Sequence, residues 1–142
     1  VLAFPEGARG TGKLFRDRYR LVRFGTGFAR LAMRTQSPVV PFAFVGGEEA
    51  VPTMLHAKRL AKLVGAPYLP VTPYILPIPL PVPCKVVFGQ PMRLEGDGSE
   101  PDDVIALQVA AVREQIEELM RVGLTGRNMP FPFSNDIPDH LR

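Results

Sequence analysis

The sequence PVVPFAFV, residues 38–45, is an unbroken apolar run that Gly46 and Gly47 end. Continuous apolar runs of this kind are typical of strands buried on both faces of a parallel sheet. A further strand is predicted over residues 85–88, and a shorter apolar run opens the chain at residues 1–4. A sheet is therefore the expected centre of the fold.

Helical patterns separate these apolar runs. Thr26 can cap a short helix over roughly residues 27–35, with Arg30 and Arg34 on its outer side. Apolar residues near helical spacing predict another helix over residues 54–64. The buried side of the first helix is expected to hold Phe28, Leu31 and Ala32.

The last helix has the clearest pattern in the sequence. Ser99 and Asp102 predict a capping-box-like start, and Gly123 can end the helix. Its expected apolar stripe consists of Ile105, Val109, Val112, Ile116 and Leu119. Because strand and helix alternate along the chain, we predict an α/β fold, a largely parallel sheet flanked by helices.

The length of 142 residues, with 46% hydrophobic residue types, fits one compact domain. The single Cys84 excludes an intrachain disulfide framework and a multi-cysteine zinc site, so a reducing compartment is expected. His56 lies among basic residues and His140 near the chain end, so both are interpreted as surface histidines, and no metal site is predicted. No signal peptide opens the chain, and the absence of an initial Met fits a piece of a longer protein.

Charge is distributed unevenly along the sequence. Residues 1–36 hold eight Lys or Arg against two acids, whereas residues 93–142 hold five against ten. A basic first third predicts an anionic partner, which can be a phosphate-bearing small molecule, an anionic lipid surface or nucleic acid. A solvated basic face is the alternative.

Residues 63–84 are uncharged but contain seven prolines. Each proline inside a helix costs about 3 kcal/mol, which excludes a transmembrane helix here. The stretch is therefore expected to be an extended apolar loop. It either packs on the protein's own core or dips into a membrane interface, an environment that suits the side chains of Tyr68 and Tyr74.

The first thirteen residues contain the candidate chemistry, and two interpretations compete. Residues 7–13 read GARGTGK and match the phosphate-binding pattern GxxxxGK. However, Leu14 stands where a hydroxyl would bind magnesium, and residues 15–19 show no helix pattern. A nucleotide triphosphatase is therefore disfavoured.

The alternative uses residues 4–9, FPEGAR, which closely resemble the FPEGTR block of the glycerolipid acyltransferases of the 1-acylglycerol-3-phosphate type. Three further blocks resemble that family in the same order. They are FGTG at residues 24–27 with Leu31-Ala32, SPVVPF at residues 37–42, and GQP at residues 89–91, before a closing amphipathic helix. The resemblance covers residues 1–123, the C-terminal part of the acyltransferase domain, and leaves 124–142 as an extension.

The resemblance assigns acceptor binding to Glu6 and Arg9, and Gly7 would let the backbone approach the ligand. Arg9 is the best candidate for a phosphate contact, because its planar guanidinium can donate two parallel hydrogen bonds. For Glu6 an ion-pair anchor that holds the loop is the alternative. Ala8 and Gly10 replace the usual Thr and Ser, so a neutral acceptor such as diacylglycerol stays open.

The family's catalytic motif is not in this chain. The family uses HxxxxD, in which histidine takes the acceptor's hydroxyl proton and aspartate orients the histidine, and neither His56 nor His140 has an aspartate five residues later. No catalytic residue is therefore assigned in this chain. The N-terminal half of the acyltransferase domain, which contains the HxxxxD motif in the family, is expected to precede Val1. The isolated chain should be inactive.

We therefore expect part of a peripheral membrane acyltransferase of phospholipid biosynthesis, at the cytoplasmic face. Its implied partners are a lysophospholipid or related glycerolipid acceptor, acyl-CoA or acyl-carrier protein as co-substrate, and the membrane surface; no other cofactor is expected. The alternative is a non-catalytic module that binds anionic lipid headgroups through Arg9, Lys13, Arg16, Arg18, Arg20 and Arg23. Nucleic-acid binding is disfavoured, because nothing resembles a recognition helix or a stacking platform.

Overall fold

The computed structural model spans residues 1–142 and describes all of them except 8–12, 57–69, 73–78 and 130–135. In chain order its elements are η1 (Phe15–Asp17), α2 (Gly27–Arg34), β1 (Phe42–Val45), α3 (Gly47–Ala50), β2 (Leu55–His56), β3 (Pro70–Val71), β4 (Lys85–Phe88), α5 (Asp102–Leu124) and η2 (Asp139–Leu141).

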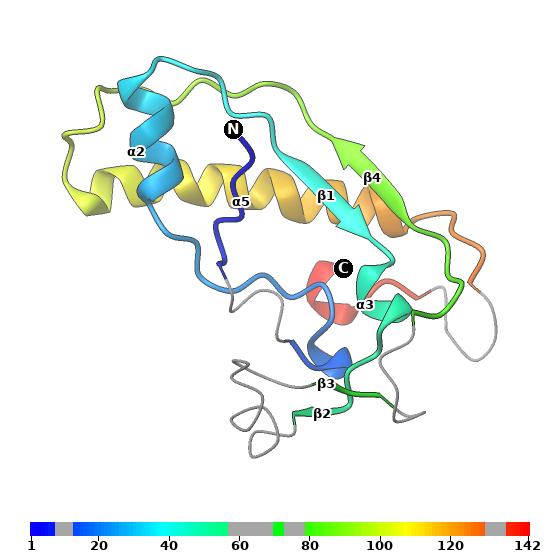
Figure 1. Ribbon diagram of the computed structural model, residues 1–142. Coiled ribbons are helices and arrows are strands. Elements are labelled where there is room, and N and C mark those ends of the chain that lie inside the picture. Colours follow the sequence, from blue (N-terminus) through cyan, green and yellow to red (C-terminus); the bar gives the residue numbers. More distant parts are fainter. Residues whose placement is uncertain (8–12, 57–69, 73–78, 130–135) are drawn as a thin grey trace.

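The long helix α5 organises the fold (Figure 1). Strands β1 and β4 lie against its C-terminal half, and α2 packs on its N-terminal half. Two apolar clusters fill these contacts. One contains Ala43, Val45, Leu119, Met120 and Leu124, and the other Phe24, Ala29, Met33, Ile105 and Val109.

The strand pairings are antiparallel in every ladder among the described residues. β1 pairs with β4 from Phe42 opposite Phe88 to Val45 opposite Lys85, and β2 pairs with β3. These ladders do not show the largely parallel sheet that the sequence predicts. The apolar run 38–45 was misleading because Phe44 is half exposed, and composition alone does not distinguish a strand buried on two faces from one with a bare apolar face.

Helix α5 confirms the predicted C-terminal helix, but its start differs from the expectation. Pro101 occupies the N-cap, and no side chain caps the helix. Instead, the carboxylate of Glu100 accepts hydrogen bonds from the amides of Asp97 and Gly98. The helix also continues through Gly123 and ends at Leu124.

Helix α2 confirms the predicted short helix, with a different buried face. Ala29 and Met33 are buried, whereas Leu31 is half exposed. Contact with α5 selects that face, since neighbouring positions on a helix are about 100° apart. The side chain of Thr26 makes no capping hydrogen bond.

Other predicted elements are absent or lie outside the described residues. Residues 1–4 form no strand. Most of the helix expected at 54–64 falls on residues the structure does not describe, and Leu55–His56 form β2 instead. The proline-rich stretch is described only at 70–72 and 79–84. Among the described residues, no helix has the length and apolarity to cross a membrane.

Candidate functional site

A tight turn over Phe4–Gly7 holds the first block of the resemblance. The Gly7 amide donates a hydrogen bond to the Phe4 carbonyl oxygen at 3.0 Å. Gly7 has a φ of 60°, the left-handed region that glycine adopts without steric cost. The position therefore favours glycine for the turn itself, whether or not a ligand approaches.

Glu6 anchors this turn to the rest of the chain. Its Oε1 accepts a hydrogen bond from the Val22 amide at 2.5 Å, and its Oε2 lies 3.1 Å from the ammonium of Lys13. The side chains of Glu6 and Lys13 are only 15% and 11% exposed. These contacts fit the ion-pair anchor that was the alternative interpretation of Glu6.

The structure brings the four resembling blocks together. The Gly25 amide of the second block donates to the Pro5 carbonyl oxygen at 3.0 Å. The rings of Phe4 and Phe42 meet edge to face at a centroid distance of 6.5 Å. The Gly89 amide of the last block donates to the Pro41 carbonyl oxygen at 2.8 Å. The second and third blocks thus touch the turn, and the last block touches the third.

Arg9, with Ala8 and Gly10, lies outside the described residues. The structure therefore does not test its assignment as the phosphate contact. Three other candidates for anion binding, Arg16, Arg20 and Arg23, are exposed, while Arg18 stacks over the ring of Phe15 at 4.8 Å. Arg16 also lies 3.5 Å from the carboxylate of Asp17, whereas Lys13 is largely buried and its ammonium lies against two carboxylates, those of Glu6 and Glu48.

A buried charged cluster lies next to this basic segment. Arg127 forms an ion pair with Glu49 at 2.9 Å, and their side chains are only 3% and 4% exposed. The hydroxyl of Tyr19 donates to Glu49 and accepts from the Gly46 amide at 2.7 Å. A Cβ at Gly46 would lie 2.5 Å from the Pro83 carbonyl oxygen, so only glycine fits at this contact.

Glu48 connects the buried cluster to the anchored turn. It accepts a hydrogen bond from the Tyr19 amide, and its other oxygen lies 3.9 Å from the ammonium of Lys13. Tyr19 itself has a φ of 61°, a conformation uncommon for a tyrosine. Its contacts through both amide and hydroxyl hold that backbone in place.

Burial changes the acidity of two groups in this cluster. Desolvation raises the pKa of Glu48, against the opposing effects of the Tyr19 amide and Lys13. Desolvation also raises the pKa of Tyr19, and the hydrogen bond to Glu49 adds to the effect. Tyr19 is therefore a neutral hydrogen-bond donor at physiological pH.

The cluster of Tyr19, Glu48, Glu49 and Arg127 was not predicted from the sequence as functional or structural. One signal was present, since two glutamates follow the apolar run and its glycine pair directly. Arg127 gave no such signal, because it lies 78 residues from Glu49 and 108 from Tyr19. Contacts at such separations leave no local periodicity.

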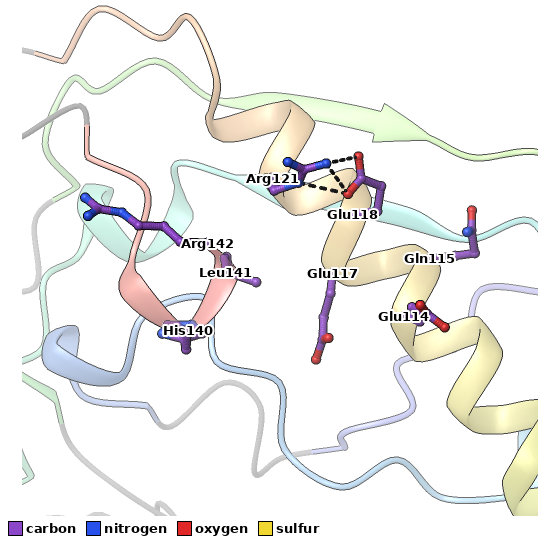
Figure 2. Close-up of a pocket in the computed structure, with 8 residues that line it drawn as sticks. All are labelled: Glu114, Gln115, Glu117, Glu118, Arg121, His140, Leu141 and Arg142. Atoms are coloured by element: carbon purple, nitrogen blue, oxygen red, sulfur yellow. Dashed lines mark hydrogen bonds and ion pairs between the residues drawn. The ribbon is translucent and has the colours of Figure 1, made fainter.

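A separate hollow of about 370 Å³ lies between α5 and η2. Figure 2 shows Glu114, Glu117 and Glu118 on the helix side and His140 on the opposite side. Arg121 is already paired with Glu118 at 2.8 Å. Neither Glu6 nor Gly7 lines this hollow, so it is distinct from the resembling blocks.

The features of a nucleotide triphosphatase do not assemble in the described residues. Lys13, the lysine of the GxxxxGK match, contacts Glu6 and Glu48. The following element, η1, has three residues and is a 3₁₀ helix. Within the described part of the chain, no group of three or more His, Cys, Asp or Glu side chains could hold a metal ion.

Comparison with known proteins finds relatives of unassigned function. Uncharacterized proteins of Mycobacterium tuberculosis, Mycobacterium bovis and Mycobacterium leprae are each 40% identical over 139 residues. The match covers 90% of this chain but only 38% of each relative. No protein-family model matches the chain. No solved structure matches it either.

Proposed function

We propose that this chain is the C-terminal part of a glycerolipid acyltransferase domain and contributes the acceptor-binding side of its active site. The observation that carries the proposal is the series of contacts that joins the four resembling blocks: the second and third touch the turn at Phe4–Gly7, and the last touches the third.

The proposed reaction transfers an acyl group from a thioester to a glycerolipid hydroxyl. The hydroxyl oxygen attacks the thioester carbonyl, a C–O ester bond forms and the C–S bond breaks, and the hydroxyl proton passes through a base to the departing thiol. The family's base is a histidine of the HxxxxD motif, which this chain does not contain. The complete reaction therefore requires a longer protein.

In this proposal the residues of the turn have separate roles. Glu6 positions the turn through Val22 and Lys13, and Gly7 permits its backbone conformation. Arg9 follows the turn by two positions and would bind the acceptor's phosphate through its guanidinium. Acyl-CoA or acyl-carrier protein would supply the acyl group. The same proposal places the complete enzyme at the membrane surface as a peripheral protein.

The test uses the protein encoded by a reading frame extended upstream of Val1, expressed with membranes. Transfer from labelled acyl-CoA to lysophosphatidic acid is measured for the unsubstituted protein, Arg9→Ala and Arg121→Ala. Arg9→Ala is expected to raise the acceptor KM about tenfold or more, the loss of a charge-assisted contact. Arg121→Ala removes the same charge from an exposed pair on α5 and should leave KM unchanged.

A non-catalytic module for anionic lipid headgroups is the second candidate, favoured by the exposure of Arg16, Arg20 and Arg23. It predicts binding to vesicles containing phosphatidylglycerol, weakened by salt, without acyl transfer. If no glycerolipid acceptor is acylated, while Arg20→Ala with Arg23→Ala reduces vesicle binding, the enzyme proposal fails and the binding module replaces it.

A further inference from the structure

The ladder of β1 and β4 has one face on the core and one apolar face without cover in the described structure. Ala43 and Val45 are buried in the cluster against α5, and Val87 packs beside them. Because strand side chains alternate, the outward face holds every second position of both strands, whereas Lys85, opposite Val45, belongs to the inward side. The outward face is defined here as Phe42, Phe44, Val86 and Phe88.

This outward face is both exposed and continuous. Phe44, Val86 and Phe88 are 52%, 49% and 69% exposed. Phe42 links the group, with its ring 6.0 Å from that of Phe88 and 6.5 Å from that of Phe4. Phe4, which is 69% exposed, extends the patch beyond the ladder. Contiguous apolar patches mark interaction surfaces, whereas single exposed apolar residues such as Leu107 on α5 are ordinary.

The ladder also needs further support because of its size. In the part of the chain that the structure describes, β1 pairs only with β4. An isolated pair of strands is marginal in water, and an apolar sheet face is normally covered by a second layer. Among the described residues no third strand joins this ladder, so the outer edges of β1 and β4 can form ladder hydrogen bonds with another strand.

We infer that the outward face of the β1–β4 ladder packs against the part of the longer homologous protein that lies outside the matched region. That part comprises about three fifths of each mycobacterial relative, since the match covers 38% of its length. A polypeptide can cover the rings and also pair with the open strand edges, whereas lipid offers no partner for backbone groups. The inference does not depend on acyl transfer.

Thiol reactivity tests this inference with a matched pair of positions. In a Cys84→Ser background, Val86→Cys places a thiol on the outward face and Leu107→Cys places one on α5, where the native side chain is 75% exposed. The same two positions are substituted in the full-length Mycobacterium tuberculosis relative, on a background without other cysteines. Each protein is treated with a water-soluble maleimide, and folding is checked by circular dichroism.

In the 142-residue chain both thiols should react at similar rates. In the full-length relative the thiol aligned with Val86 should react at least about tenfold more slowly than that aligned with Leu107, because buried thiols are inert. Equal rates in the full-length relative overturn the inference. Protection of the thiol at position 86 in the 142-residue chain also overturns the inference. Protection at high protein concentration indicates a second copy, and protection only in the presence of lipid vesicles indicates a lipid surface.

A second measurement avoids cysteine substitution. The dye ANS should bind the 142-residue chain, and the double substitution Phe44→Ser with Phe88→Ser should reduce its fluorescence by about half or more, because ANS reports exposed apolar surface. Leu107→Ser should leave the signal unchanged. The unsubstituted full-length relative should bind little dye, and a signal as large as that of the 142-residue chain would contradict the proposed cover.

Discussion

Two regions of the molecule are stabilised by different interactions. Around α5, apolar side chains from α2, β1 and β4 form the core, including Met33, Val45 and Ile105, none of them exposed. Beside it, polar contacts hold residues 13–20. Lys13 pairs with Glu6, and Tyr19 donates a hydrogen bond to Glu49, which in turn pairs with Arg127. The first region responds to lost volume and the second to lost charge balance, so substitutions should separate them.

The largest expected effect is in the charged region. Glu49→Ala should lower the free energy of unfolding by about 3–5 kcal/mol, because Arg127 would remain buried without its partner. Urea denaturation measures the change. Glu49→Leu combined with Arg127→Met should cost clearly less than Glu49→Ala, because the double variant leaves no uncompensated charge and also removes the Arg127 Nε, which has no hydrogen-bond partner among the described residues. An equal or greater loss would show that packing, not charge, governs the cluster.

A somewhat smaller effect is expected in the apolar region. Ile105→Ala should destabilise the protein by about 2–4 kcal/mol, since it removes three carbon atoms from a fully buried site between α2 and α5. The same substitution at Leu107, which is largely exposed on the same helix, should cost less than about 0.5 kcal/mol. Similar losses at the two positions would mean that α5 is not packed as described.

The pH dependence of stability should differ between the regions. The raised pKa of Glu48 means that the folded state holds this proton more tightly than the unfolded state, whose reference value is 4.5. Glu48 therefore contributes stability below that value, and the contribution is lost as the pH rises through the higher folded pKa.

Glu48→Gln should flatten this part of the profile, because glutamine keeps an acceptor for the Tyr19 amide but does not ionise. Urea midpoints between about pH 4 and 8 measure the slope. Glu118→Gln, which changes an exposed ion pair on α5, is the control. Its urea midpoint should vary with pH as that of the unsubstituted protein does in the range where Glu48 titrates. An unchanged slope in Glu48→Gln would remove Glu48 from the explanation.

The smallest effect is expected at the surface. Arg30 joins α2 to the start of α5 through Asp102, at 2.7 Å, but the Asp102 side chain is 80% exposed. Asp102→Asn should cost about 0.2–1 kcal/mol and less at high salt, as is usual for exposed ion pairs. A loss above about 2 kcal/mol would show that this contact, rather than the apolar cluster, fixes α2 on α5.

The sequence predicted the apolar region better than the charged one. Helices α2 and α5 and strand β4 follow from local periodicity and turn residues, which is why they were found. Strand direction was not recoverable in the same way, because pairing Phe42 with Phe88 is a relation between distant segments. The buried face of α2 was also missed, since contact with α5 decides it.

The acceptor-binding roles that the sequence predicts for Glu6, Gly7 and Arg9 stay predictions. The residues of the turn, Glu6 and Gly7, were identified, and the structure describes their local contacts. The assignment of Arg9 stays a prediction. The supporting residues Tyr19, Glu49 and Arg127 were not found, because their interaction depends on three-dimensional proximity and on burial, neither of which leaves a motif.

The position of Arg127 affects the order in which the chain can fold. Its contact with the Tyr19 hydroxyl spans 108 residues, and it lies three residues beyond the end of α5. Closing so large a loop is entropically costly and comes late in folding. During synthesis, the buried carboxylate of Glu49, which the Tyr19 hydroxyl contacts, therefore receives its counter-charge only after another 78 residues have been made. Until then, a chaperone or protease would encounter the segment around Tyr19 without the ion pair between Arg127 and Glu49.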